Sequence, residues 1–255
     1  MQTRLPVQIN KGSGDPVVLI HGLGNNHKSW TYVLENFDYS KNKVIAVDLL
    51  GFGDAPKPTD VDYTAADHAD AVIQTLDNLG IKDAVIAGHS MGCLVATEVA
   101  RKRPDLVSRL VLLGSPIFKK LPGKFDKVKF WKREDLYSKL FKIISAEKDL
   151  TLAAANGVVQ FLPLIKGMEV TEETWPAFKK SLRNTIIQTQ TYKDLTKIET
   201  PTSLLYGVLD LFVIKKNLKS VARRNKKYVT YSTAIGPHEI TPVNGKKIAE
   251  LLQES

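Results

Sequence analysis

The chain has 255 residues and a formal net charge of +9, with 43% hydrophobic and 25% charged residues, as in one large globular domain or one domain with an insertion. The single cysteine, Cys93, excludes an intrachain disulfide and a cysteine-rich zinc site. No apolar run reaches the roughly 18 residues of a membrane-spanning helix, and no apolar leader segment opens the chain. We therefore expect a cytoplasmic protein without a membrane span.

The positive charge is concentrated in the second half of the chain. Residues 1–116 carry a net charge of −2, residues 117–200 carry +6 and residues 201–255 carry +5. The densest stretch, from Lys215 to Lys227, has seven basic residues and no acidic one. Nucleic-acid binding is one interpretation, but no aromatic residue alternates with these charges and no nucleic-acid motif is present. We interpret the stretch as a solvated helix face and expect no nucleic-acid partner.

Short apolar runs alternate with amphipathic segments along most of the chain. One amphipathic helix is predicted to begin at Thr64, where Asp67 completes a capping box, and to stop at Gly80. Strands that alternate with helices predict an α/β fold, with a mostly parallel twisted sheet covered by helices on both faces. The predicted strands cover residues 16–22, 43–49, 83–88, 109–115, 201–207 and 227–233.

The alternation stops between Ile117 and Thr200, where the periodicity is helical. An insertion of this length in an α/β core often serves as a lid or cap. We predict a core formed by residues 1–117 and 185–255, and a helical cap formed by residues 118–184. Most aromatic residues of the insertion are expected to form its own core; they are Phe130, Trp131, Tyr137, Phe141, Phe161, Trp175 and Phe178.

A candidate nucleophile lies in the G-x-S-x-G sequence from Gly88 to Gly92. It follows a predicted strand and precedes a predicted helix, which is the setting of a nucleophile elbow. Such a turn strains the serine backbone, and the flanking glycines let neighbouring backbone approach closely. The helix start adds free N–H groups and the positive end of the helix dipole. We therefore predict that Ser90 is a nucleophile rather than an ordinary turn serine.

A serine nucleophile needs a general base, and the base needs an orienting acid. His238 follows the last predicted strand, and Asp210 follows the strand before it. Both residues are thus expected at the carboxyl edge of the sheet, where open α/β sheets place their sites. A solvated loop histidine and a helix-capping aspartate are the alternatives for each residue alone. The order Ser90, Asp210, His238 is the one that accompanies a nucleophile elbow, so we predict a catalytic triad.

Acyl transfer also needs donors for the developing oxyanion. One donor is expected to be the backbone N–H of Met91, which follows the nucleophile. The other is expected from the glycine-rich loop after the first core strand, where we assign the N–H of Leu23. A plain strand-to-helix turn is the alternative for this loop.

Five short motifs occur in order: HGLG at 21–24, DLLGFGDAPKP at 48–58, GHSMG at 88–92, YGVLD at 206–210 and GPH at 236–238. With them, the chain from Pro16 onward resembles the α/β-hydrolase superfamily, in its small, capped, bacterial carboxylesterase-like branch. The resemblance implies a helical cap inserted after the strand at 109–115. Most relatives have two further strands before the HG motif, whereas about 15 residues precede Pro16 here. We expect at most one strand there, between Leu5 and Asn10.

The resemblance implies a serine hydrolase that cleaves small carboxylic esters through an acyl-enzyme and needs no metal or organic cofactor. A serine at position 90 argues against haloalkane dehalogenases and epoxide hydrolases, whose relatives carry aspartate there. Thioesterases, lactonases, peroxidases and hydrolases of carbon–carbon bonds in aromatic ring-cleavage products remain alternatives. A ligand receptor on a hydrolase scaffold is a further alternative. The expected partner is a small-molecule substrate, and the sequence does not indicate an oligomeric state.

Overall fold

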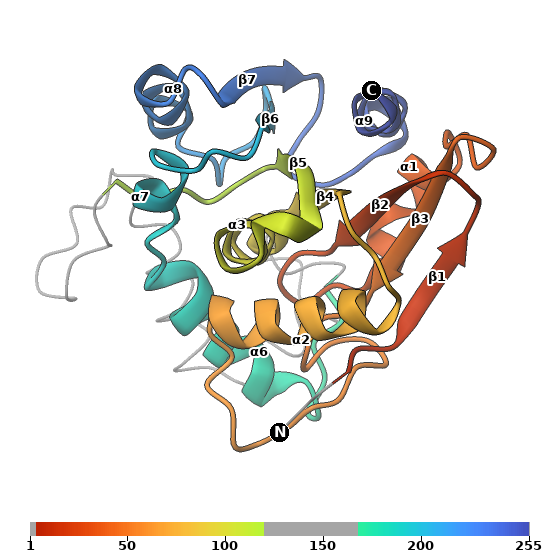
Figure 1. The fold of residues 1–255 in the computed structure, drawn as a ribbon. Coiled ribbons are helices and arrows are strands. Elements are labelled where there is room, and N and C mark those ends of the chain that lie inside the picture. The colour runs from red at the N-terminus through yellow and green to blue at the C-terminus, as the bar shows by residue number, and fades with distance from the viewer. Residues whose placement is uncertain (1–3, 120–167, 255) are drawn as a thin grey trace, which may run out of the picture.

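The computed structural model describes residues 4–119 and 168–254, and its centre is a seven-stranded sheet (Figure 1). The strand order is β1-β3-β2-β4-β5-β6-β7. Strands β2 to β7 are all parallel, and β1 pairs antiparallel with β3. The predicted α/β fold is therefore confirmed, with one strand, β1, before the strand β2 that leads into the HG motif. The strands are β1 (Val7–Lys11), β2 (Asp15–Ile20), β3 (Asn42–Val47), β4 (Ala84–His89), β5 (Val107–Leu113), β6 (Thr202–Gly207) and β7 (Val229–Ala234).

Helices cover both faces of the sheet because successive strand residues point to opposite sides. In β2, Val18 and Ile20 belong to the core cluster that contains residues of α2, α3, α6 and α8. Val17 and Leu19 belong to the opposite cluster, which contains residues of α1 and α9. Figure 1 shows these two helical layers. The helices are α1 (Thr31–Leu34), α2 (Ala65–Asn78), α3 (Met91–Lys102), α6 (Trp175–Ser181), α7 (Thr191–Leu195), α8 (Lys215–Arg224) and α9 (Pro242–Gln253).

Helix α2 begins where the sequence predicts. The Thr64 side chain accepts a hydrogen bond from the Asp67 N–H, and the Asp67 carboxylate accepts one from the Thr64 N–H. This reciprocal pair satisfies two amides that the first helical turn cannot satisfy itself. Gly80 follows the helix with a φ of 65°, a conformation that glycine adopts without a Cβ clash.

The predicted cap lies largely outside the described residues, but its C-terminal part is described. Here α6 and the π-helical turn Leu182–Ile187 pack beside α2 (Figure 1). The Ser181 hydroxyl and the His68 Nε2 atom of α2 lie 3.1 Å apart. Phe178, which we expected in a core of the insertion itself, is instead fully buried in the core cluster shared with α2 and α3. This part of the insertion is therefore anchored on the core.

Candidate active site

Ser90 occupies a strained turn between β4 and α3. Its φ of 53° and ψ of −117° lie in a region that residues with a Cβ rarely adopt. The turn is tight enough to require both flanking glycines. A Cβ on Gly88 would lie 2.4 Å from the Gly92 carbonyl oxygen, and a Cβ on Gly92 would lie 2.3 Å from the Ile20 carbonyl oxygen. The backbone therefore has the form of a nucleophile elbow.

Asp210 and His238 form a hydrogen-bonded pair. Asp210 follows β6, His238 follows β7, and His238 Nδ1 lies 2.8 Å from Asp210 Oδ2. The second carboxylate oxygen, Oδ1, accepts hydrogen bonds from the N–H groups of Phe212 and Val213 at 2.8 and 3.2 Å. Burial opposes ionisation, but the hydrogen bonds from His238 and these two amides outweigh it and lower the pKa of Asp210.

The ionised Asp210 determines which nitrogen of His238 carries the proton. A carboxylate can only accept a hydrogen bond, so Nδ1 is the donor, and Nε2 of the neutral ring keeps a free lone pair. The Asp210 side chain is fully buried, whereas that of His238 remains 12% exposed. The histidine therefore has an oriented basic nitrogen that can accept a proton, which is the requirement for a general base.

The ring of His238 has little lateral freedom. The Phe212 ring lies 4.8 Å from it, centroid to centroid. A Cβ on Gly114, which has a φ of 64°, would come within 3.0 Å of His238 Cε1 and 3.3 Å of Asp210 Oδ2. Gly114 therefore provides the space that the pair occupies. The sequence does not reveal this role, because its only signal is the position of this glycine at the end of a predicted strand.

Ser90 is linked to the surroundings of His238 through His89, the last residue of β4, and through Leu113, the last residue of β5. His89 Nε2 lies 2.9 Å from the His238 carbonyl oxygen, and the two rings are 5.1 Å apart. Burial lowers the pKa of His89 to about 4, so its neutral ring donates this hydrogen bond. The Ser90 N–H donates to the Leu113 carbonyl at 2.8 Å, directly before Gly114. The structure thus brings the three predicted triad residues to one place at the carboxyl edge of the sheet.

The glycine-rich loop at residues 21–26, which we call the oxyanion loop, lies against the nucleophile. A Cβ on Gly22 would lie 3.1 Å from the Ser90 Cβ atom. The Asn25 N–H donates to the Gly22 carbonyl at 3.3 Å, and Gly24 has a φ of 65°, so the four residues form a tight turn with Leu23 as its second residue. Met91 is the first residue of α3, and the helix itself offers no acceptor for its N–H.

His21 fixes the direction of the Leu23 amide. The Leu49 N–H donates to His21 Nε2 at 2.9 Å, so the proton of the neutral ring is on Nδ1, which donates to the Gly22 carbonyl at 2.8 Å. Burial lowers the pKa of His21 to about 4, so the ring stays neutral. Because the peptide is planar and trans, fixing the Gly22 carbonyl points the Leu23 N–H the opposite way. His21 begins the HGLG motif, but the sequence did not reveal this role.

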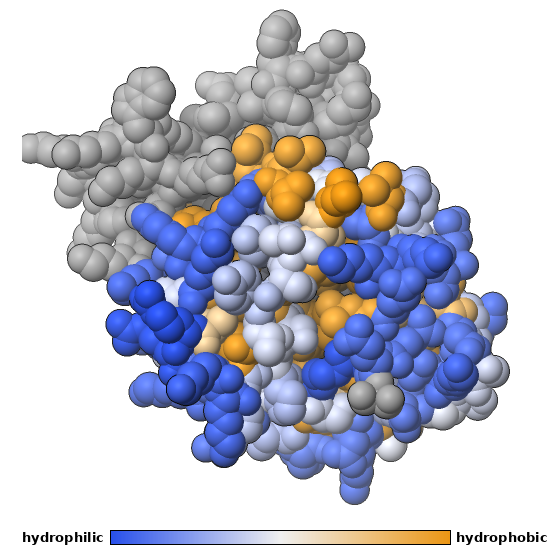
Figure 2. All heavy atoms as spheres, turned by 90° about the horizontal axis from the view of Figure 1, so that it is seen from above, coloured by the Kyte–Doolittle hydropathy of each residue, from blue (hydrophilic) through white to orange (hydrophobic). Residues whose placement is uncertain are grey.

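Apolar side chains border the Asp210–His238 pair. Leu209 and Leu211, on either side of Asp210, are 67% and 59% exposed, and Ile235 is 74% exposed. The two loops that carry them are joined by a hydrogen bond from the Leu209 N–H to the Gly236 carbonyl at 3.1 Å. Figure 2 shows apolar side chains gathered on the face seen from above, beside hydrophilic surface. We call Leu209, Leu211 and Ile235 the apolar rim.

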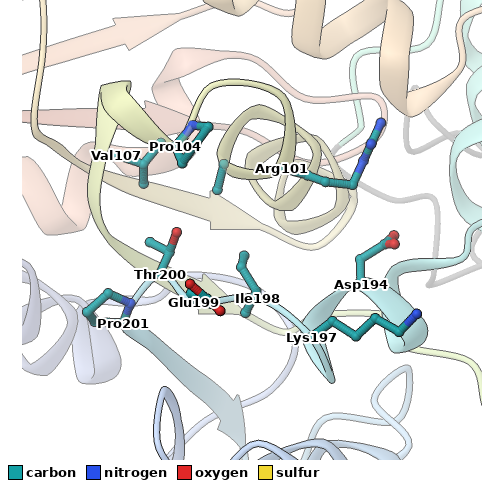
Figure 3. Close-up of a pocket in the computed structure, with 10 residues that line it drawn as sticks. Arg101, Pro104, Val107, Asp194, Lys197, Ile198, Glu199, Thr200 and Pro201 are labelled. Carbon is teal, nitrogen blue, oxygen red and sulfur yellow. The ribbon is translucent and has the colours of Figure 1, made fainter.

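A separate cavity of about 540 Å³ lies at the opposite edge of the sheet (Figure 3). Val107 begins β5 and Pro201 directly precedes β6, so these lining residues are at the amino ends of the strands. Arg101, Asp194 and Lys197 contribute charged side chains to its wall. None of the predicted catalytic residues lines this cavity, so it is distinct from the candidate active site.

Neither a metal-binding cluster nor a membrane-spanning helix is seen in residues 4–119 and 168–254. No group of three or more His, Cys, Asp or Glu side chains in these ranges could hold a metal ion. No helix within the same ranges is both long and apolar enough to cross a membrane.

The model of a known family, described as the alpha/beta hydrolase fold, matches residues 15–234. The chain belongs to this family. The chain is 39% identical over 115 residues to the "Probable lysophospholipase BODYGUARD 2" of Arabidopsis thaliana, a match that covers 43% of this chain and 24% of the plant protein. It is 37% identical over 109 residues to the "2-hydroxymuconate semialdehyde hydrolase" of a Pseudomonas strain, covering 42% of this chain and 38% of that protein.

Among solved structures, the chain is similar to an esterase from Exiguobacterium antarcticum. The TM-score is 0.74, the sequence identity is 18%, and the match covers 99% of this chain and 98% of the esterase. At this identity, the likeness shows the shared fold alone. The first curated relatives are matched over 24% to 30% of their own length, so the chain spans less than a third of each of these proteins.

Proposed function

We propose that this hydrolase cleaves small carboxylic esters through a Ser90–His238–Asp210 triad. The observation that carries the proposal is the His238–Asp210 hydrogen bond of 2.8 Å beside a serine in a strained elbow. A pair with a buried, ionised carboxylate and a free Nε2 lone pair is suited to remove a proton from a neighbouring hydroxyl group.

In the proposed reaction, Ser90 Oγ attacks the carbonyl carbon while His238 Nε2 accepts the serine proton. The N–H groups of Leu23 and Met91 stabilise the tetrahedral oxyanion. His238 then gives its proton to the leaving alcohol, and Ser90 retains the acyl group. A water molecule, deprotonated by His238, hydrolyses the acyl-enzyme and regenerates Ser90. Asp210 keeps the histidine in one tautomer and stabilises its charged form.

The apolar rim supports the proposal that the substrate is an ester with an apolar acyl or alcohol group. Exposed leucine and isoleucine side chains beside His238 and Asp210 gain free energy when a substrate removes them from water. The partial match to a probable lysophospholipase is consistent with an ester substrate. We also propose that the protein is cytoplasmic and that its substrate is a small molecule. The predicted cap at residues 118–184 would select this substrate.

The test measures the hydrolysis of p-nitrophenyl esters of graded acyl length by the wild-type protein, by Ser90→Ala and by Ser40→Ala, a control at an exposed serine. We expect Ser90→Ala to lose about 10³-fold or more in kcat, and Ser40→Ala to match the wild type. The acyl length with the highest kcat/KM reports the size of the pocket. Full turnover by Ser90→Ala would overturn the proposal.

The second candidate function is hydrolysis of a carbon–carbon bond in an aromatic ring-cleavage product. It is favoured by the 37% identity to a 2-hydroxymuconate semialdehyde hydrolase over 109 residues, and it would use the same triad. A dienol-type keto acid assayed beside the p-nitrophenyl esters separates the two functions. A kcat/KM on the keto acid far above that on every ester would select this second function.

A further inference from the structure

The segment that leads into α6 is bound directly to the oxyanion loop. The main-chain N–H of Glu169 donates to the Gly24 carbonyl at 2.6 Å. The Asn26 Nδ2 group donates to the Glu169 carboxylate at 2.5 Å. A single residue therefore holds two members of the loop, one through its backbone and one through its side chain, although 143 positions separate Glu169 from Asn26.

Van der Waals contacts reinforce these hydrogen bonds. A Cβ on Gly24 would lie 2.9 Å from the Phe178 ring and 3.1 Å from the Met168 Cβ atom. The glycine lets the loop backbone approach this segment, and its φ of 65° suits the turn. The loop and the segment before α6 therefore form one packed unit.

The Asn26 side chain has a defined orientation. It is 6% exposed, and its Oδ1 atom accepts the Lys28 N–H at 2.8 Å. The amide group at the other end must therefore point away from Lys28, toward Glu169. A buried amide donor without an acceptor costs free energy, so the Glu169 carboxylate stabilises this arrangement of the loop.

Glu169 itself is supported by α6. The Thr174 hydroxyl lies 3.3 Å from the Glu169 carbonyl oxygen, and the Trp175 N–H donates to the Thr171 carbonyl at 2.9 Å. The fully buried Phe178 anchors the same helix in the core. The residue that contacts the loop is thus itself held in position by α6.

The turn that contains Leu23 is held at both of its ends. His21 fixes the Gly22 carbonyl at the start of the turn, and the Glu169 contacts fix Gly24 and Asn26. We propose that Glu169 is a positioning residue that holds the Leu23 N–H in place for the oxyanion. The inference rests on the proposed ester hydrolysis, because the Leu23 donor has that role only in such a reaction.

The role predicts a particular kinetic signature. The full negative charge on the substrate oxygen exists in the transition state and not in the bound ester, so a misplaced donor lowers kcat more than it raises KM. Removing a whole oxyanion donor costs about a hundredfold to a thousandfold in kcat. Loosening a donor that remains present is a smaller change, and we expect a loss of about tenfold.

The experiment measures kcat and KM for a p-nitrophenyl ester in Glu169→Ala, Glu169→Gln and Glu173→Ala. Glu169→Ala should lower kcat about tenfold with KM within about twofold of wild type. Glu169→Gln should keep most of the activity, because its amide oxygen can still accept from Asn26. Glu173→Ala removes the same charge from the same segment, but the Glu173 carboxylate faces Lys57 at 3.7 Å, so this control should match the wild type.

A reversible transition-state mimic, a trifluoromethyl ketone, adds a second readout. Its inhibition constant should rise in Glu169→Ala by about the same factor by which kcat/KM falls, which a merely structural role would not produce. If Glu169→Ala does not fold, Glu169→Asp, which keeps the charge but shortens the side chain, should show the same kcat-selective loss.

The outcomes separate this inference from the proposed function. Unchanged kcat in Glu169→Ala, with activity that still requires Ser90, would overturn the positioning role and leave the esterase proposal intact. A rise in KM with unchanged kcat would also overturn it, because that result indicates ground-state binding. Activity that survives Ser90→Ala would overturn the proposed function itself.

Discussion

Two histidine–aspartate pairs with nearly the same geometry lie at the carboxyl edge of the sheet in the described part of the chain. His238 Nδ1 is 2.8 Å from Asp210 Oδ2, and His27 Nδ1 is 2.9 Å from Asp48 Oδ1. Both aspartates are buried and follow a parallel strand, and both accept two backbone N–H groups. The geometry of a histidine–aspartate pair at the sheet edge therefore does not by itself identify a general base.

The two pairs differ in their neighbours. His238 lies beside His89, Gly114 and the elbow that carries Ser90. Asp48 instead faces its own loop, where it accepts the Asp54 N–H at 3.1 Å and where a Cβ on Gly53 would lie 2.2 Å from its carboxylate. The neighbours therefore support the proposed catalytic role for the His238 pair, which lies beside the serine elbow, and they favour a role in loop structure for the His27 pair.

The largest expected difference is between the two histidines. His238→Ala should lower kcat/KM about 10³- to 10⁴-fold, because the proposed base is lost. His27→Ala should change kcat/KM by no more than about threefold, since in the described part of the chain its ring hydrogen-bonds Asp48, away from the Ser90 elbow. Ester hydrolysis by the two purified variants measures both effects, and similar losses in both would show that the pairs are not functionally distinct.

The two aspartates should separate activity from stability. Asp210→Asn should lower kcat about 10³- to 10⁴-fold with little change in KM, because the amide no longer selects the reactive tautomer of His238. Asp48→Asn should lower the free energy of unfolding by about 1–3 kcal/mol, since a buried acceptor of the His27 and Asp54 N–H groups is weakened. Urea unfolding beside ester kinetics gives both quantities. An inactive but stable Asp48→Asn variant would contradict the assignment.

Matched glycine substitutions sharpen the comparison further. Gly114→Ala places a Cβ within 3.0 Å of His238 at a φ of 64°, so kcat should fall about tenfold as the ring is displaced. Gly53→Ala places a Cβ 2.2 Å from the Asp48 carboxylate at a φ of 50°, so stability should fall by about 1–3 kcal/mol. Kinetic assays at a temperature where both variants are folded test the contrast, and a larger kcat loss in Gly53→Ala would reverse it.

The last expected effect is on stability alone and concerns three buried histidines that belong to neither pair. Burial lowers the pKa of His21 and His89 to about 4 and that of His68 to about 3, from an ordinary 6.5. The unfolded chain binds these protons near pH 6.5, whereas the folded chain resists them until pH 3–4. Stability should therefore fall as the pH drops below 6.5.

Urea unfolding at pH 7.5 and at pH 5 measures this loss. His68→Gln removes one of the three groups and should reduce the difference in unfolding free energy between the two pH values by about a third. Lys82→Gln, which alters an exposed side chain, serves as a control that should leave the difference unchanged. An undiminished difference in His68→Gln would show that this histidine is not part of the acid response.

The sequence was sufficient to predict those features that depend on a short local pattern of residues. The strands, the Thr64 cap and the Ser90 elbow depend on patterns of a few residues, and the structure has each of them. Asp210 and His238 were found because each follows a predicted strand of a parallel sheet. The assignment of catalytic roles to these residues remains a prediction.

Contacts between distant segments could not be predicted in the same way. The His21 bond to Leu49 spans 28 positions, and the Asn26 bond to Glu169 spans 143. No periodicity relates such residues, and the direction of a side chain depends on the packing of several elements. For the same reason, the His27–Asp48 pair and the space at Gly114 became visible only in the folded chain.

The packing of Met168 and Glu169 on the oxyanion loop has a consequence for protein engineering. Substrate range in a hydrolase can be altered by grafting the insertion of one enzyme onto the core of another. A chimaera whose junction lies before Met168 would keep the native contacts with Gly24 and Asn26, and with them the turn that carries the proposed oxyanion donor. A junction placed a few residues later would transplant a foreign partner for that turn, so under the proposed mechanism the choice of splice site would itself affect the catalytic rate.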